Sequence, residues 1–146
     1  MAKFSRRIRA HIAEFARRTE GAVAVEFVLI APILFALLFG IVTLGFFIGV
    51  SHSVNQLATD AARASVAGLD ETERRQIAVA YLAEAERRYP LLTNEALSTT
   101  LDYDPSADHS LSISVSYNAD GTLLDVANGF LGLGITAVNG RAYVAY

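Results

Sequence analysis

The feature that most constrains this chain is a long uncharged run near its N-terminus. Residues 27–59 contain no Asp, Glu, Lys or Arg, and residues 22–50 contain a single charge, Glu26. A helix over residues 22–50 would be roughly 43 Å long, against about 30 Å for the hydrocarbon core of a bilayer. Its Leu, Ile, Val and Phe residues favour insertion by about 5–10 kcal/mol, whereas one carboxylate near an end costs at most about 3 kcal/mol. The run therefore predicts a transmembrane helix over residues 22–50.

The charge distribution predicts how this helix is oriented. Residues 1–21 carry six basic and two acidic side chains, whereas residues 22–146 carry six basic and 13 acidic ones. Basic segments stay in the cytoplasm, so residues 1–21 are expected to form a cytoplasmic leader and residues 51–146 a domain on the other side. The acidic balance of this domain argues against nucleic-acid binding. The absence of cysteine excludes disulfides and thiolate metal sites.

The basic leader and apolar run differ from an ordinary secretory signal, because the run is about twice the 7–15 residues of a typical signal core. We expect either an uncleaved signal-anchor or a chain that is cut on the cytoplasmic side. In residues 1–20 the apolar side chains have helical spacing. A short helix on the membrane surface and a disordered basic leader are both compatible with this pattern.

The remaining sequence predicts an α+β fold. Apolar spacing of 3.6 residues continues past the membrane to about Gly68, so one helix of about 45 residues is expected to extend from the membrane into the soluble domain. A second helix fits residues 71–89, with Glu71→Arg75 and Glu84→Arg88 pairs on its exposed side. Period-two alternation then predicts a small antiparallel sheet of about three strands, near residues 98–103, 110–117 and 135–146.

The connections between these strands are expected to be short. Residues 104–108 have the composition of a hairpin loop. Residues 122–134 are apolar but rich in glycine, which predicts an irregular loop or a short helix. Asn139-Gly140 predicts a bulge or kink in the last strand.

No pattern of catalytic or metal-binding residues is found. His11, His52 and His109 lack metal-ligand spacing, and Asp102, Asp104 and Asp108 lack the glycine and terminal glutamate of a calcium loop. The glycines of residues 129–134 do not have the order of a dinucleotide fingerprint. The chain is therefore expected to be no enzyme and to hold no cofactor or metal.

Two features of the membrane helix each have two interpretations. Glu26 is either a carboxylate that reaches the interface, or the partner of a new α-amine if the chain is cut after Gly21. The helix also contains residues that suit close helix packing, although they are equally compatible with simple flexibility. These residues are Pro32, Gly40, Gly45 and Gly49.

The basic leader, Gly21, four small or apolar residues, Glu26 and the aromatic Phe27 resemble the class III prepilin motif G/XXXXE[Y/F] of tight-adherence (Tad, Flp) pilus systems. The run EFVLIAPILFALLFGIVTLG followed by ATDAARASVAG is similar to TadE-like minor pseudopilins. The resemblance extends mainly over residues 18–68. Phe27 departs from the more usual tyrosine, which removes a hydroxyl and keeps the ring.

The resemblance implies a maturation pathway and a set of partners. A prepilin peptidase would cut between Gly21 and Ala22, and Glu26 would serve maturation or subunit docking. The partners implied are this peptidase, the Flp pilin, other minor pseudopilins, the Tad inner-membrane secretion machinery and membrane lipid. The protein would cross the bacterial inner membrane once, with residues 51–146 in the periplasm, and either remain there or enter the extracellular pilus.

A different class of function has the same topology. An uncleaved, signal-anchored periplasmic binding or sensor module would also carry a basic leader, one membrane helix and an acidic outer domain. The two interpretations differ in the mature N-terminus, which is Ala22 for the pseudopilin and Met1 or Ala2 for the anchored module.

Overall fold

The computed structural model describes residues 19–104 and 110–145. The chain divides into two compact units, Met1–Ile41 and Val42–Tyr146, and helix α2 (Thr19–Ser65) contributes to both. The two predictions for the leader, a surface helix or a disordered segment, concern residues that lie almost entirely outside the described ones. Of the predicted hairpin loop at residues 104–108, only Asp104 is described.

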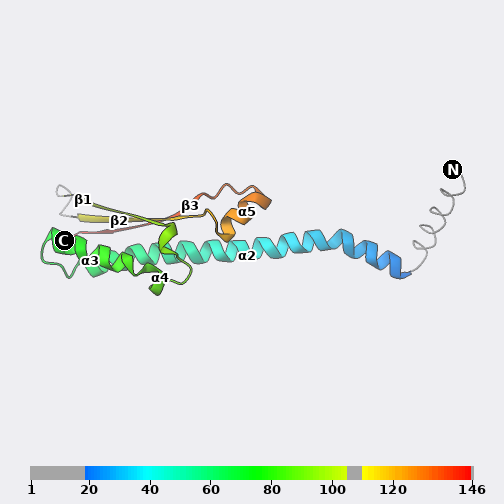
Figure 1. Cartoon of the computed structure of the whole chain (residues 1–146), viewed down its shortest axis with the longest axis horizontal. Helices are drawn as coiled ribbons and strands as arrows, with labels where there is room; N and C mark the ends of the chain where they lie inside the picture. The colour runs from blue at the N-terminus through cyan, green and yellow to red at the C-terminus, as the bar shows by residue number, and fades with distance from the viewer. Residues whose placement is uncertain (1–18, 105–109, 146) are drawn as a thin grey trace, which may run out of the picture. The chain divides into compact units, whose positions relative to one another are not determined.

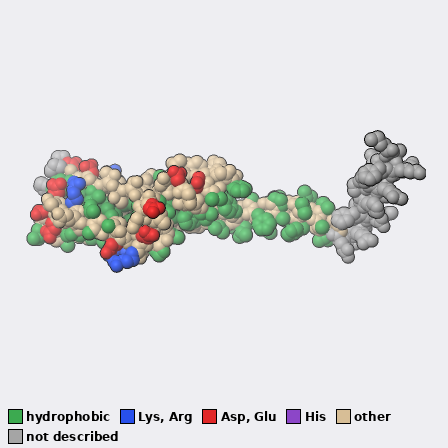
Figure 2. Space-filling model, viewed as in Figure 1, with side chains coloured by type: hydrophobic (Ala, Val, Ile, Leu, Met, Phe, Trp, Pro, Cys, Tyr) green, Lys and Arg blue, Asp and Glu red, His purple; other side chains and the backbone are tan. Residues whose placement is uncertain are grey.

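The first unit, in its described part, is the N-terminal portion of α2. Its apolar side chains are mostly more than half exposed, with values of 63% for Val23, 64% for Phe27 and 71% for Ile33. The space-filling view shows hydrophobic side chains along this portion (Figure 2). The helix continues through Pro32, whose ring nitrogen cannot donate the hydrogen bond to the carbonyl four residues earlier. Segment Gly21–Ser65 is long and apolar enough to cross a membrane, which suggests single-pass anchoring.

The second unit has a core built on the C-terminal portion of α2. Residues three or four apart on one face of this helix are fully buried, and they pack into a single hydrophobic cluster with the sheet and the following helices. They are Val50, Val54, Leu57, Ala58 and Ala61. The prediction that one helix continues from the uncharged run to the region of Gly68 is confirmed, and the helix ends at Ser65.

The predicted second helix is present but interrupted. Helix α3 (Glu71–Ala83) is capped by Asp70, whose carboxylate accepts a hydrogen bond of 2.8 Å from the Glu73 amide. At Glu84 the amide bonds to the Tyr81 carbonyl three residues earlier, at 3.2 Å, and helix α4 (Ala85–Arg88) follows. The prediction of one helix over residues 71–89 was therefore wrong at Glu84, where this tighter turn replaces the α-helical pattern.

The predicted antiparallel sheet has three strands in the order β1-β2-β3. They are β1 (Leu97–Asp104), β2 (Ser110–Asn118) and β3 (Ala137–Val144), and a short 3-10 helix η1 (Asn94–Ala96) precedes β1. The sheet lies along the C-terminal portion of α2 (Figure 1). On the central strand Leu111, Ile113, Val115 and Tyr117 are buried in the core, and the intervening serines are partly exposed. The alternation in the sequence thus correctly predicted this face.

Strand β3 differs from expectation at Gly140. Pairing with β2 is continuous through Asn139↔Ser116 and Gly140↔Val115, so the predicted bulge was wrong. The glycine instead permits close contact with α2. A Cβ at Gly140 would lie 2.9 Å from the backbone nitrogen of Asn55 and 2.9 Å from the carbonyl carbon of Val54.

Between β2 and β3 the chain forms helix α5 (Leu123–Leu131), the short helix that was one of the two predictions for this segment. Thr122 caps it by accepting a hydrogen bond from the Leu124 amide, and Gly132 ends it in the left-handed conformation at φ 63°. Asn128 then holds the returning chain, because its side-chain amide both donates to the Ile135 carbonyl at 2.6 Å and accepts from the Ile135 amide at 3.0 Å.

Candidate processing site and assembly helix

The predicted processing site lies near the start of the described part of α2. This part starts at Thr19 and includes the bond between Gly21 and Ala22. Glycine at position 21 lowers the cost of opening the helix locally, because glycine loses the most conformational freedom in a helix.

Glu26 is exposed and lies four residues after Ala22, so both residues are on the same helix face. Among the described residues it makes no ion pair. The neighbouring Val25 and Phe27 are also more than half exposed. The arrangement presents one carboxylate, one turn from a potential new N-terminus, on an otherwise apolar surface.

The predicted helix-packing residues fall into two groups. At Gly40 and Gly45 an added Cβ would meet nothing within 4 Å, so the space beside both is open within the chain. At Gly49 an added Cβ would lie 2.8 Å from the Leu91 side chain, so this glycine already has a neighbour in its own chain. Pro32 is exposed. Whether another helix packs against Gly40 and Gly45 stays a prediction.

Ala36 was not among the predicted helix-packing residues. Ala36 is exposed and precedes Gly40 by four residues, which is the spacing that lets two helices approach closely. The signal was present in the sequence, because small residues four apart can be read directly from it.

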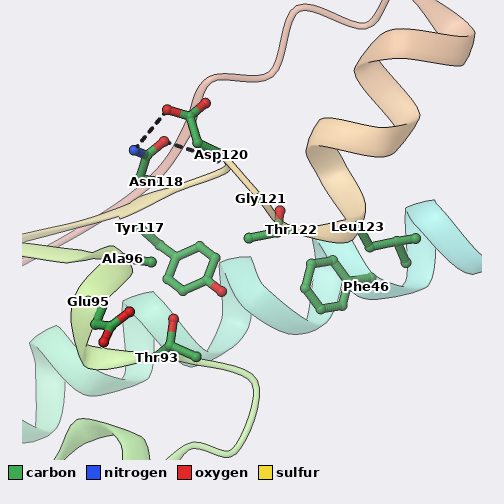
Figure 3. A pocket seen from close by; sticks show the side chains of 10 residues that line it. All are labelled: Phe46, Thr93, Glu95, Ala96, Tyr117, Asn118, Asp120, Gly121, Thr122 and Leu123. Carbon is green, nitrogen blue, oxygen red and sulfur yellow. Dashed lines mark hydrogen bonds between the residues drawn. The ribbon is translucent and has the colours of Figure 1, made fainter.

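A pocket of about 550 Å³ opens between α2, η1, β2 and the turn that precedes α5. Figure 3 shows Phe46 and Tyr117 on its wall, with Glu95 and Asp120 as its acidic side chains. Asp120 is held by Asn118, whose side-chain amide donates to it at 3.1 Å. The described residues contain no group of three His, Cys, Asp or Glu side chains that could hold a metal ion. No pattern in the sequence predicts this pocket, because its walls come from segments that are distant in the chain.

A polar network joins α4 to α2. The Tyr89 hydroxyl donates to the Asp60 carboxylate at 2.7 Å, and burial together with this bond raises the pKa of Tyr89. The Arg88 guanidinium lies 4.4 Å from the centre of the Tyr81 ring and donates to Glu84 at 2.6 Å. This hydrogen bond, with a further one from Arg87, lowers the pKa of Glu84. The Tyr89–Asp60 bond ties the end of α4 to α2, and the contacts of Arg88 with Tyr81 and Glu84 link α4 to the end of α3.

Comparison with known proteins gives one finding. Residues 21–63 match the model of the TadE-like protein family. No curated protein and no solved structure matches the chain. The matched segment begins at Gly21 and lies entirely within α2. It includes Gly21, Glu26 and Phe27 and most of the apolar run of the predicted resemblance, and residues 21–63 are similar to this family.

Proposed function

We propose that this protein is a minor pseudopilin that takes part in assembling a Tad/Flp-type adhesive pilus. The observation that carries the proposal is the family match, which begins at Gly21 and continues through Glu26 and the apolar helix. TadE-like proteins are associated with Tad pilus assembly, and the match therefore suggests this involvement. The absence of a catalytic pattern in the sequence supports a non-enzymatic role.

The first finer part of the proposal is processing by a prepilin peptidase. The peptidase cuts the bond between Gly21 and Ala22 in α2, where the glycine lowers the cost of local opening. The cut releases the basic leader and leaves Ala22 with an α-ammonium group. Glu26, one turn away, neutralises this amine or that of a neighbouring subunit.

The second part concerns location and partners. Helix α2 anchors the chain in the bacterial inner membrane, and the second unit lies in the periplasm, as the charge asymmetry favours. The open sides of Gly40 and Gly45 receive helices of the Flp pilin or of other minor pseudopilins. The Tad secretion machinery in the inner membrane acts on the assembled subunits.

Two substitutions separate processing from assembly. In cells that co-express a prepilin peptidase, Gly21→Leu is expected to keep the leader, which is visible as a slower band on a gel. Gly40→Leu adds similar bulk further along the same helix and is expected to be cut normally but to lose crosslinks to partner helices. Normal processing of Gly21→Leu would refute the cleavage site.

The role of Glu26 needs a separate experiment. Glu26→Gln keeps the size of the side chain and removes its charge. We expect the variant to remain in the membrane fraction and to lose assembly, because the carboxylate pairs with an amine and is not needed for insertion. Undiminished pilus assembly by Glu26→Gln would contradict this role.

A second candidate is an uncleaved, signal-anchored periplasmic binding or sensor module. The pocket beside Phe46 and Tyr117 favours it, because a cavity of about 550 Å³ is large enough for a small ligand. This candidate requires the leader to remain attached. The mature N-terminus therefore decides between the two functions.

A further inference from the structure

Helix α5 exposes apolar side chains that the fold does not cover. Leu124 and Ala127 are buried in the core on one side of this helix. On the other side Val126 is 52% exposed and Phe130 83% exposed, and Leu133 in the following loop is 48% exposed. Val126 and Phe130 are four residues apart and so lie on one face of α5, and Leu133 adds a further exposed apolar side chain just after the helix ends.

The segment that carries this surface is also free of charge. Residues 126–140 contain no Asp, Glu, Lys or Arg. The bonds between Asn128 and Ile135 hold the loop after α5 in place, so Leu133 is presented in a fixed position. A solvent-facing helix normally carries charged side chains on its outer face. The charged residue of α5, Asp125, lies in its first turn and accepts a hydrogen bond from the Gly121 amide at 3.2 Å. The rest of α5 and the loop after it therefore indicate an apolar environment on their outer side.

The position of α5 in the second unit identifies the apolar environment on its outer side. The helix lies at the end of the sheet where β2 ends and β3 begins (Figure 1). Its first residue, Leu123, shares the wall of a pocket with Phe46 of α2 (Figure 3). Phe46 is four residues from Val42, where the second unit begins. At this level of α2 the side chains of Val42, Leu44 and Ile48 are also more than half exposed.

The length of the apolar run places the part of α2 around Phe46 at the membrane surface. About 20 residues are enough to span the hydrocarbon core, whereas the uncharged run continues from residue 27 to residue 59. A span that starts near Ala22 therefore ends close to Val42. Phe46 and the neighbouring α5 then lie at the boundary between acyl chains and headgroups.

We propose that α5 and the loop after it insert their apolar face into the outer boundary of the same bilayer that α2 crosses. Val126, Phe130 and Leu133 enter the interfacial layer, to a depth of about 5–10 Å as is usual for such helices. Since the segment carries no basic residue, the contact is apolar and needs no anionic lipid. The second unit is thereby fixed against the membrane surface at a second point. The inference depends on the membrane anchoring of α2 and does not depend on the pilus role.

Tryptophan fluorescence can test this contact, because the chain contains no tryptophan. Three single variants of the full chain, Phe130→Trp, Phe35→Trp and Leu69→Trp, are reconstituted in phosphatidylcholine vesicles with brominated acyl chains. Phe35 is 65% exposed in the apolar portion of α2, and Leu69 is 89% exposed in the turn after that helix. Bromine is placed either near the headgroup end or near the methyl end of the chains.

We expect bromine near the headgroups to quench tryptophan at position 130 several-fold more than tryptophan at position 69. Tryptophan at position 130 is also expected to be protected from aqueous iodide. Position 35 is expected to respond most to the deeper bromine. If position 35 is quenched by lipid and position 130 is not, the proposal is overturned while the anchoring of α2 stands. If position 130 is protected from iodide but insensitive to brominated lipid, protein covers α5 and the proposal is also overturned. If neither position responds to lipid, the anchoring itself is refuted.

Discussion

The close approach of β3 to α2 at Gly140 gives the sharpest prediction for the fold. A Cβ placed there would meet two backbone atoms of α2 at 2.9 Å, whereas ordinary contacts begin at 3.4 Å. Gly140→Ala therefore requires the sheet and the helix to separate by about half an ångström. Backbone atoms cannot rotate away as a flexible side chain can, so the shift extends to neighbouring core contacts, such as those of Val54.

The expected change in the free energy of unfolding for Gly140→Ala follows from two opposing effects. Inserting one methyl group into a packed core typically costs about 1–3 kcal/mol, partly because a gap of about 0.5 Å already removes roughly a quarter of the dispersion energy of each affected contact. Replacing glycine with alanine recovers about 0.4–1 kcal/mol by restricting the unfolded chain. We expect Gly140→Ala to lower the free energy of unfolding by about 1–2 kcal/mol.

The assay is urea unfolding of the full chain in non-ionic micelles, followed by tyrosine fluorescence, to which the buried Tyr117 contributes. For a domain of this size the expected loss lowers the urea midpoint by roughly 1 M. Gly129→Ala is the matched control. Gly129 is exposed in the interior of α5 with open space beside it, so alanine there should raise stability by about 0.5–1 kcal/mol. A Gly140→Ala protein as stable as the parent, with the control behaving as expected, would refute the packing of β3 on α2.

Three further predictions concern polar contacts of the second unit. Tyr89→Phe should lower the free energy of unfolding by about 1–2 kcal/mol, because Asp60 loses its hydroxyl donor. The difference from the parent should shrink as pH rises above 10.0, the ordinary tyrosine pKa, because Tyr89 loses its proton in the unfolded chain before it does so in the folded protein. Glu84→Gln should lower the thermal midpoint slightly at neutral pH. The effect should begin to shrink below pH 4.5 and vanish only once pH is below the lowered pKa of Glu84 in the folded protein, where the carboxylate that bonds to Arg88 is protonated. Asn128→Ala should cost about 1–3 kcal/mol and speed amide exchange in the loop after α5, and unchanged exchange would show that the two hydrogen bonds do not hold this loop.

The sequence predicted those parts of the fold that have a strong local period. The uncharged run and its 3.6-residue continuation predicted α2 as one helix, and the alternation of serine with Leu111, Ile113 and Val115 predicted the central strand and its buried face. Both patterns are visible without knowledge of the partners, because helices and strands place every buried residue at a fixed interval.

Features that depend on distant segments were not predictable in this way. Glycine at position 140 is compatible with a bulge and with close packing, and only the neighbouring α2 backbone distinguishes them. The turn at Glu84 breaks a helical pattern that the local sequence favours, and it accompanies the contact of Tyr89 with Asp60. The pocket and the exposed face of α5 result from tertiary packing. The processing motif could be read from the sequence because its residues are consecutive, and its role stays a prediction.

The measurement that tests the central claim most directly is the N-terminal sequence of the mature protein. The chain is extracted from membranes of cells with and without a co-expressed prepilin peptidase whose activity is verified on an Flp pilin, and its intact mass and N-terminal peptide are determined by mass spectrometry. The pseudopilin account predicts that Ala22 is the first residue only when the peptidase is present. An N-terminus at Met1 or Ala2 with the active peptidase would contradict this account and favour the uncleaved anchored module.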